Sequence, residues 1–113
     1  MSTYTGIVQK GAKRGKELGF PTANIALDDA SVSGIYAAKV KVGDTEYKAA
    51  AFADQERKIL EAHLLDFAGD LYGQSITIEL LKKIRESALF TDDAVLRAAI
   101  AADIAKVREY FKN

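Results

Sequence analysis

The first candidate site is a glycine-rich, basic segment near the N-terminus. Four glycines fall within fourteen positions, and four basic residues lie among them: Gly6, Gly11, Gly15 and Gly19, with Lys10, Lys13, Arg14 and Lys16. Glycine lets the backbone approach a bound anion closely, and lysine and arginine balance its charge. The segment therefore predicts a phosphate-facing loop. A solvated basic hairpin tip has the same composition, and glycine and charge alone do not separate the two.

The second candidate follows directly, in Phe20, Pro21, Thr22, Ala23 and Asn24. Pro21 fixes its own φ and disfavours helix at Phe20, so the chain is expected to be extended here. Side chains two residues apart on an extended chain share a face, which places the Thr22 hydroxyl beside the Asn24 amide. Neutral oxygens in this arrangement suit Mg²⁺, which takes its ligands from waters, phosphates and a few protein oxygens. The alternative is an ordinary turn with an Asx-type hydrogen bond.

The third candidate lies in residues 60–64, where polar and apolar side chains alternate. On an extended strand this alternation places Glu61 and His63 on one face and Leu60, Ala62 and Leu64 on the other. Glu61 then stands on a rigid element, from which its carboxylate could take a proton from an attacking hydroxyl. A glutamate on a strand is more often a solvated surface residue, however, and His63 is predicted to be a hydrogen-bonded structural residue.

The fourth candidate is the segment of residues 82–90, between the last predicted strand and the helix. Arg85 offers a planar fork of donors and Phe90 an aromatic face, which together could fold over a flat heterocycle. In the structural alternative, Phe90 closes the base of the helix and Arg85 is solvated.

Short strands must position these candidates, and they fill the first two-thirds of the chain. Alternation and intervening turn residues predict strands over residues 4–9, 23–26, 35–42, 45–52, 59–66 and 74–81. Gly43 and Asp44 tolerate the positive φ of a tight hairpin turn, so the third and fourth strands are expected to be antiparallel neighbours. Six strands in so short a chain favour a small closed barrel.

The end of the chain changes to a helical period. Apolar residues recur there at three- and four-residue spacing, at Leu96, Ile100, Ile104, Val107 and Phe111. This stripe predicts an amphipathic helix packed on the barrel. Thr91, followed by Asp92 and Asp93, supplies a capping oxygen and negative charge at its N-terminus.

Composition excludes several classes of function. The 113-residue chain carries sixteen basic and sixteen acidic residues, so no overall field draws it to nucleic acid or an anionic membrane. It has no cysteine, which excludes disulfides and thiolate-ligated metals, and the single histidine cannot form a zinc site alone. The sequence contains neither a signal-peptide pattern nor a membrane-length apolar run. We therefore expect one domain over residues 1–113, a cytoplasmic monomer that binds neither nucleic acid nor membrane.

In this order, the candidate segments resemble the riboflavin kinase family, including the kinase half of bifunctional FAD synthetases. The resemblance runs from Gly6 to about Arg108. It is carried by Leu18-Gly19-Phe20-Pro21-Thr22-Ala23-Asn24-Ile25, Gly34-Ile35-Tyr36, Glu61-Ala62-His63-Leu64-Leu65-Asp66-Phe67, Asp70-Leu71-Tyr72-Gly73, Ile84-Arg85, Phe90 and Asp103-Ile104. Any one of these strings is weak, whereas the ordered set is specific.

The resemblance implies a mainly β fold, a six-stranded antiparallel Greek-key β-barrel with one C-terminal amphipathic α-helix. It also implies transfer of the γ-phosphate of ATP to the ribityl 5′-hydroxyl of riboflavin, with Mg²⁺ as cofactor and FMN and ADP as products. By matching motifs, Thr22 and Asn24 hold Mg²⁺, Glu61 is the catalytic base, and Arg85 and Phe90 enclose the flavin ring. The implied nucleotide-binding residues are Gly11, Lys13, Gly15, Lys16, Gly19, Thr22 and Asn24.

One segment departs from the family pattern. After the fourth strand the family usually has Asn-Ile-Gly, then Arg-Pro-Thr and a variable loop, whereas residues 50–58 lead here directly to Ile59. Nucleotide affinity, donor choice or activity itself can therefore differ from those of the family. Three classes remain: a kinase, favoured by Thr22, Asn24 and Glu61; a non-catalytic flavin-binding barrel; and a nucleic-acid-binding barrel, which the balanced charge disfavours.

Overall fold

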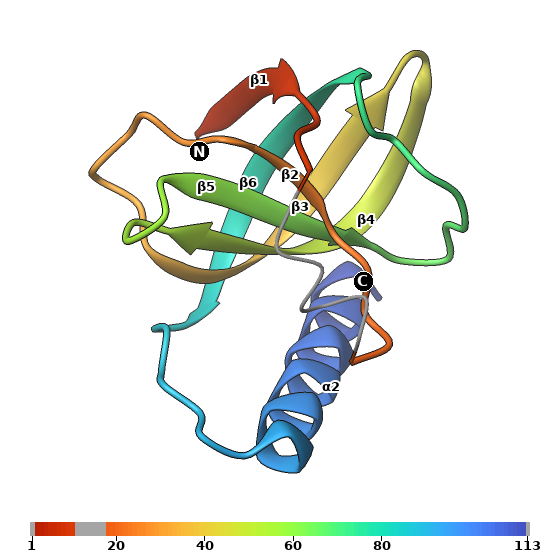
Figure 1. Ribbon diagram of the computed structural model, residues 1–113. Coiled ribbons are helices and arrows are strands. Elements are labelled where there is room, and N and C mark those ends of the chain that lie inside the picture. Colours follow the sequence, from red (N-terminus) through yellow and green to blue (C-terminus); the bar gives the residue numbers. More distant parts are fainter. Residues whose placement is uncertain (1, 11–17, 113) are drawn as a thin grey trace.

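The computed structural model (Figure 1) describes residues 2–10 and 18–112. These residues form strands β1 (Thr3–Ile7), β2 (Ala23–Ala26), β3 (Gly34–Val42), β4 (Thr45–Asp54), β5 (Ile59–Leu64) and β6 (Ser75–Arg85), followed by helix α2 (Asp93–Phe111). The six predicted strands and the predicted helix are therefore confirmed. The largest difference is at β6, which runs four residues past the predicted end at residue 81. It continues because its last residues still pair with β3, where Ile35 lies opposite Arg85.

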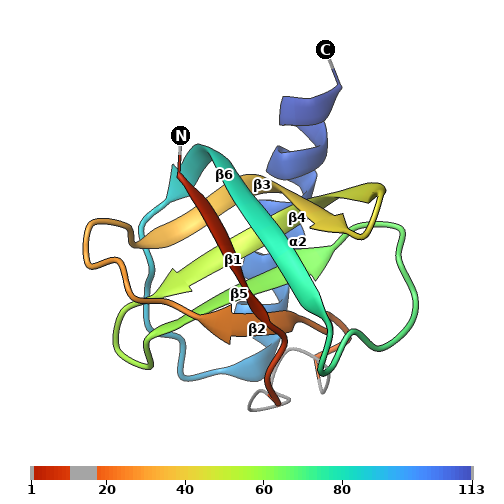
Figure 2. The same cartoon turned by 90° about the horizontal axis from the view of Figure 1, so that it is seen from above.

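The strands form a sheet in the order β1-β6-β3-β4-β5-β2, and every pair is antiparallel. Strands β3, β4 and β5 are consecutive neighbours, and β6 returns to lie beside β3, which is the Greek-key arrangement. Figure 2 shows the sheet curling round so that its outer strands, β1 and β2, approach each other. Just after β1, the backbone nitrogen of Gln9 donates to the carbonyl of Asn24 at 2.7 Å. The result is the nearly closed barrel that was predicted.

The expected hairpin joins β3 to β4. Val42 pairs with Thr45 across a two-residue turn, and Gly43 takes a φ of 59°. The barrel interior is filled by the apolar sides of the alternating strands, including the fully buried Ile25, Val40, Leu60, Ile76, Ile78 and Leu80. Small side chains on β4, among them Ala49, Ala51 and Ala53, complete this core. This tight interior leaves the polar faces of β2 and β5 pointing outward, and the candidate site is built on them.

Helix α2 packs against the outside of the barrel, below the sheet in Figure 1. Its predicted stripe is confirmed, because Val107 is fully buried and Ile104 and Phe111 are partly buried against Ala37 of β3 and Ala50 of β4. Those alanines lie opposite each other, which lets the helix approach the sheet closely. The helix is capped by Asp92, one residue after the predicted Thr91, and its Oδ1 accepts from the backbone nitrogen of Ala94 at 2.8 Å. In the part of the chain described here, no helix is long and apolar enough to span a membrane.

Candidate functional site

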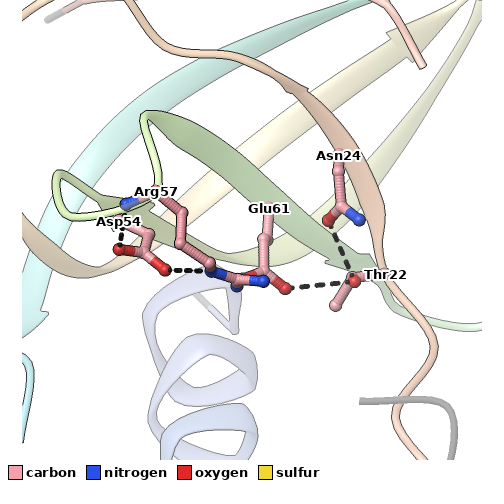
Figure 3. Close-up of polar contacts among 5 residues, drawn as sticks. All are labelled: Thr22, Asn24, Asp54, Arg57 and Glu61. Carbon is pink, nitrogen blue, oxygen red and sulfur yellow. Dashed lines mark hydrogen bonds and ion pairs between the residues drawn. The ribbon is translucent and has the colours of Figure 1, made fainter. Parts of the chain in front are cut away.

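The pairing of β2 with β5 brings the main candidate residues together. Asn24 lies opposite Glu61 in this ladder, and Thr22 lies just before β2 (Figure 3). The Thr22 Oγ1 atom is 3.1 Å from Asn24 Oδ1 and 3.3 Å from Glu61 Oε1. The Thr22 hydroxyl has one proton, which it can donate to only one of these two acceptors at a time. Three residues that the sequence analysis singled out thus form one contiguous group of oxygens.

The Thr22 and Asn24 oxygens suit a magnesium ion. Adjacent ligands of an octahedral Mg²⁺ with bonds of roughly 2.1 Å lie about 3.0 Å apart. The 3.1 Å separation of Thr22 Oγ1 and Asn24 Oδ1 matches this distance. Within residues 2–10 and 18–112, no cluster of three or more His, Cys, Asp or Glu side chains could hold a metal. Any ion here would therefore take most of its ligands from water and phosphate.

Glu61 occupies a sheltered position on β5. Its side chain is 16% exposed, and the residues on either side of it, Leu60 and Ala62, point into the core. Burial raises the pKa of Glu61 above the ordinary value for a glutamate, and the nearby Arg57 charge and the Thr22 hydrogen bond reduce but do not cancel this rise. A raised pKa brings a carboxylate closer to the basicity that suits proton abstraction near neutral pH.

Arg57, on the turn between β4 and β5, is the second partner of Glu61. The Arg57 Nη2 atom forms an ion pair with Glu61 Oε2, the oxygen not directed at Thr22 (Figure 3). Asp54 holds Arg57 in turn, since its Oδ2 accepts from Arg57 Nε at 2.7 Å and its Oδ1 accepts from the Arg57 backbone nitrogen at 3.2 Å. The chain Asp54–Arg57–Glu61–Thr22–Asn24 is continuous.

Two cavities meet at this group. One, of about 560 Å³, is lined by Thr22 and Asn24 together with Lys10, Asp70 and Tyr72. The other, of about 220 Å³, is lined by Thr22 and Glu61 and by residues of β3, β4, the segment before α2 and the helix itself. Thr22 alone of the three oxygen-bearing residues lines both cavities.

The smaller cavity has mainly apolar walls, to which Leu18, Phe20, Ile35, Phe52, Phe90, Leu96 and Ile100 contribute. Arg85 and Phe90, the predicted flavin contacts, both line it, and the Arg85 guanidinium lies 5.7 Å from the centre of the Phe90 ring. Arg85 is only 25% exposed and is held by an ion pair, which differs from the alternative in which it is solvated. Its Nε and Nη2 atoms each donate to a different oxygen of Asp103 at 2.8 Å, and Asp103 is buried within α2.

His63 makes the hydrogen bond expected of a structural residue. Its Nδ1 atom is 2.7 Å from the carbonyl oxygen of Pro21, and its ring meets that of Phe20 edge to face. This contact ties β5 to the segment that carries Thr22.

Of the residues predicted to bind the nucleotide, Gly19, Thr22 and Asn24 lie within the described part of the chain. Gly19 has a φ of 91°, which glycine adopts without strain, and it is exposed just before the Thr22 segment. Gly11, Lys13, Gly15 and Lys16 lie outside the described residues, so their predicted role stays a prediction.

Sequence reasoning missed several residues around these cavities. Arg57 lies in the shortened connection, where no motif marks it, and nothing in the sequence pairs Asp103 with Arg85. Tyr72 lines the larger cavity beside Lys10 of the predicted basic loop, with the Lys10 ammonium 5.9 Å from the Tyr72 ring centre. For Tyr72 the available signal is the Asp70-Leu71-Tyr72-Gly73 string, which marks this loop without indicating what it faces.

The family model and the relatives that match this chain are both of riboflavin kinase. The family model for riboflavin kinase, also called flavokinase, matches residues 2–111. The bifunctional riboflavin kinase/FMN adenylyltransferase of Escherichia coli K12 is 39% identical over 116 residues, covering 95% of this chain and 37% of that protein. The chain thus spans less than two-fifths of the length of such relatives.

Solved structures share the fold. A macrolide-efflux protein from Streptococcus pneumoniae superposes with a TM-score of 0.80 at 28% identity, over 94% of this chain and 38% of that one. The riboflavin kinase of Trypanosoma brucei superposes with a TM-score of 0.75 at 24% identity, over 98% of this chain and 77% of that one. The predicted combination of a barrel and a C-terminal helix is therefore confirmed.

Proposed function

Because the chain belongs to the riboflavin kinase family, we propose that it transfers the γ-phosphate of ATP to the ribityl 5′-hydroxyl of riboflavin, giving FMN and ADP. The observation that carries the proposal is the meeting of two cavities at Thr22, with Asn24 on one side and Glu61 on the other. Phosphoryl transfer depends chiefly on holding donor and acceptor side by side and on neutralising charge. Two adjoining cavities with oxygen ligands and a carboxylate at their junction meet both needs.

The two substrates are assigned by the character of the walls. The smaller cavity is flanked by aromatic and aliphatic side chains, which suits the flat isoalloxazine ring. The larger cavity carries Lys10 and lies beside the Asn24 oxygen, which suits the charged nucleotide. The ribityl chain would then extend from the smaller cavity toward Thr22, and the γ-phosphate would reach the same point from the larger one.

Glu61 is the proposed catalytic base. Its Oε1 atom faces the junction at Thr22, where it would accept the proton of the ribityl 5′-hydroxyl. The hydroxyl oxygen forms the new bond to the γ-phosphorus, while the bond from that phosphorus to the β–γ bridging oxygen breaks and ADP leaves. The raised pKa of Glu61, caused by burial, supports this role.

Thr22 and Asn24 would hold the magnesium ion that such a reaction uses. Their oxygens have the spacing of adjacent ligands. When bound, the ion would neutralise charge on the phosphates. With its oxygen used in this way, the Thr22 hydroxyl would direct its proton to Glu61 rather than to Asn24.

A direct assay tests the proposal. The protein is incubated with riboflavin, Mg²⁺ and, in turn, each nucleoside triphosphate, and FMN is measured by chromatography. FMN formation with ATP is the expected result. No FMN with any donor, together with quenching of riboflavin fluorescence, would replace the kinase by the non-catalytic flavin-binding barrel. Salt-sensitive oligonucleotide binding without a flavin response would favour the nucleic-acid-binding barrel. Cytoplasmic location and the monomeric state stay predictions.

A further inference from the structure

The turn between β4 and β5 carries an arginine, Arg57, to which the proposed mechanism gives no role. The turn is short, since Asp54 and Ile59 already pair across the two strands and only residues 55–58 lie between them. This is the connection in which the family's usual motif is absent. It carries Arg57, whose guanidinium lies against the side chain of Glu61.

Hydrogen bonds fix the turn on both sides, and they limit the positions that Arg57 can take. On one side, Asp54 accepts hydrogen bonds from both the backbone nitrogen and the Nε atom of Arg57. On the other, the Gln55 Nε2 atom donates to the carbonyl oxygens of Asp29 and Val32, each at 2.6 Å. Lys58 completes the turn with a φ of 57°. A group supported in this way can hold a neighbouring side chain in one orientation.

The carboxylate of Glu61 is divided between two partners. Its Oε2 atom pairs with Arg57, and its Oε1 atom is directed at Thr22 and the junction of the cavities. The terminal torsion of a glutamate is intrinsically broad, so nothing in the residue itself selects this orientation. The ion pair with Arg57 holds one oxygen, and the other lies 3.3 Å from the Thr22 hydroxyl, so both contacts favour this orientation.

We propose that Arg57, supported by Asp54, is a positioning residue that orients the carboxylate of Glu61 toward the acceptor hydroxyl. The inference rests on the proposed function, because it assigns Arg57 a role through Glu61. Arg57 is 42% exposed, so water screens its half of the ion pair, whereas Glu61 is only 16% exposed. Removing Arg57 should therefore lower stability modestly and act mainly on turnover.

The variants are chosen to separate positioning from other roles. Arg57→Gln removes the charge and the fork, whereas Arg57→Lys keeps the charge but not the planar fork. Asp54→Asn weakens the support of Arg57 and leaves both direct contacts of Glu61 in place, although it also removes a charge that raises the pKa of Glu61. Arg108→Gln is the matched control, because it removes a surface ion pair with Asp66 at 3.1 Å, away from both cavities.

Steady-state kinetics with riboflavin and ATP give the readout. Arg57→Gln should lower kcat by roughly 10- to 100-fold, the scale of a misplaced catalytic group, with both KM values within a few-fold of wild type. Arg57→Lys and Asp54→Asn should fall between wild type and Arg57→Gln, and Arg108→Gln should match wild type. In the Glu61→Gln background, Arg57→Gln should change the remaining rate by less than about 2-fold, since there is no base left to orient.

If the wild-type protein forms FMN, any of three results would overturn the inference. The first is a kcat for Arg57→Gln within about 2-fold of wild type. The second is a raised KM for riboflavin with unchanged kcat, which would make Arg57 a substrate-binding residue. The third is a fall in kcat caused by Arg57→Gln that is equally large in the wild type and in the Glu61→Gln background. If Arg57→Gln does not fold, Arg57→Lys and Asp54→Asn decide between the same outcomes. A wild type that forms no FMN would overturn the proposed function and this inference together.

Discussion

Asp103→Ala should destabilise the protein strongly, because it removes the partner that ties Arg85 of β6 to helix α2. Both oxygens of Asp103 accept from Arg85 at 2.8 Å, and the side chains of Arg85 and Asp103 are only 25% and 6% exposed. Breaking a fully buried ion pair costs about 3–5 kcal/mol. Water can still reach Arg85, and alanine offsets roughly 0.5 kcal/mol through its helix propensity, so the expected loss is about 2–3 kcal/mol.

This loss corresponds to a measurable shift in melting temperature. For 113 residues, an unfolding entropy of roughly 2.1 cal/mol/K per residue converts it into a Tm lower by about 8–13 °C. Thermal unfolding followed by circular dichroism measures the shift. Asp103→Asn, which keeps one acceptor, should lose about half as much. Arg108→Gln, which breaks only the exposed pair with Asp66, should melt close to wild type. A Tm for Asp103→Ala within about 2 °C of wild type would show that the pair does not hold the helix on the barrel.

Three further predictions concern the proposed metal site, a glycine in β3 and the burial of Glu61. Thr22→Ala should weaken binding of Mg²⁺-ATP more than binding of riboflavin, because it deletes an oxygen at the proposed metal position; equal losses in titrations of both ligands would make Thr22 a structural residue. Gly34→Ala should lower the Tm more than Gly43→Ala, because both have positive φ but only at Gly34 would the new Cβ lie 2.5 Å from a backbone oxygen, that of Arg85; similar melting of the two variants would contradict this. Glu61→Gln should raise the Tm at neutral pH. Because burial raises the pKa of Glu61 in the folded protein, stability is highest below the ordinary glutamate pKa and is lost as pH rises through the folded pKa. Glutamine carries no charge and avoids this loss. The difference from wild type should shrink toward pH 4, and a difference independent of pH would refute the role of burial.

The strand pattern and the main oxygen group could be predicted because they depend on local periodicity. Alternation around Glu61 has a period of two, and burial of Leu60 and Ala62 leaves only one face on which Glu61 can lie. The extended Thr22 segment similarly required Thr22 and Asn24 to project together. That Asn24 and Glu61 would lie opposite each other followed only once β2 was paired with β5.

The partners of two arginines could not be predicted, because they depend on packing between distant or irregular segments. Arg85 and Asp103 are 18 residues apart and meet only where α2 docks on the barrel. Arg57 reaches Glu61 through a turn that requires Lys58 to take a positive φ, which a lysine does not signal. The division of the site into two cavities depends on the same packing.

The catalytic assignment of Glu61 is tested most directly by measuring turnover and substrate binding in the same Glu61→Gln preparation. The substitution keeps the size of the side chain and its capacity for hydrogen bonds but removes its basicity. Riboflavin and Mg²⁺-ATP should bind with nearly unchanged Kd, while FMN formation falls by roughly 10²- to 10⁴-fold, as expected for loss of a general base. A folded Glu61→Gln variant that forms FMN within a few-fold of the wild-type rate would contradict the account and make Glu61 a structural residue of β5.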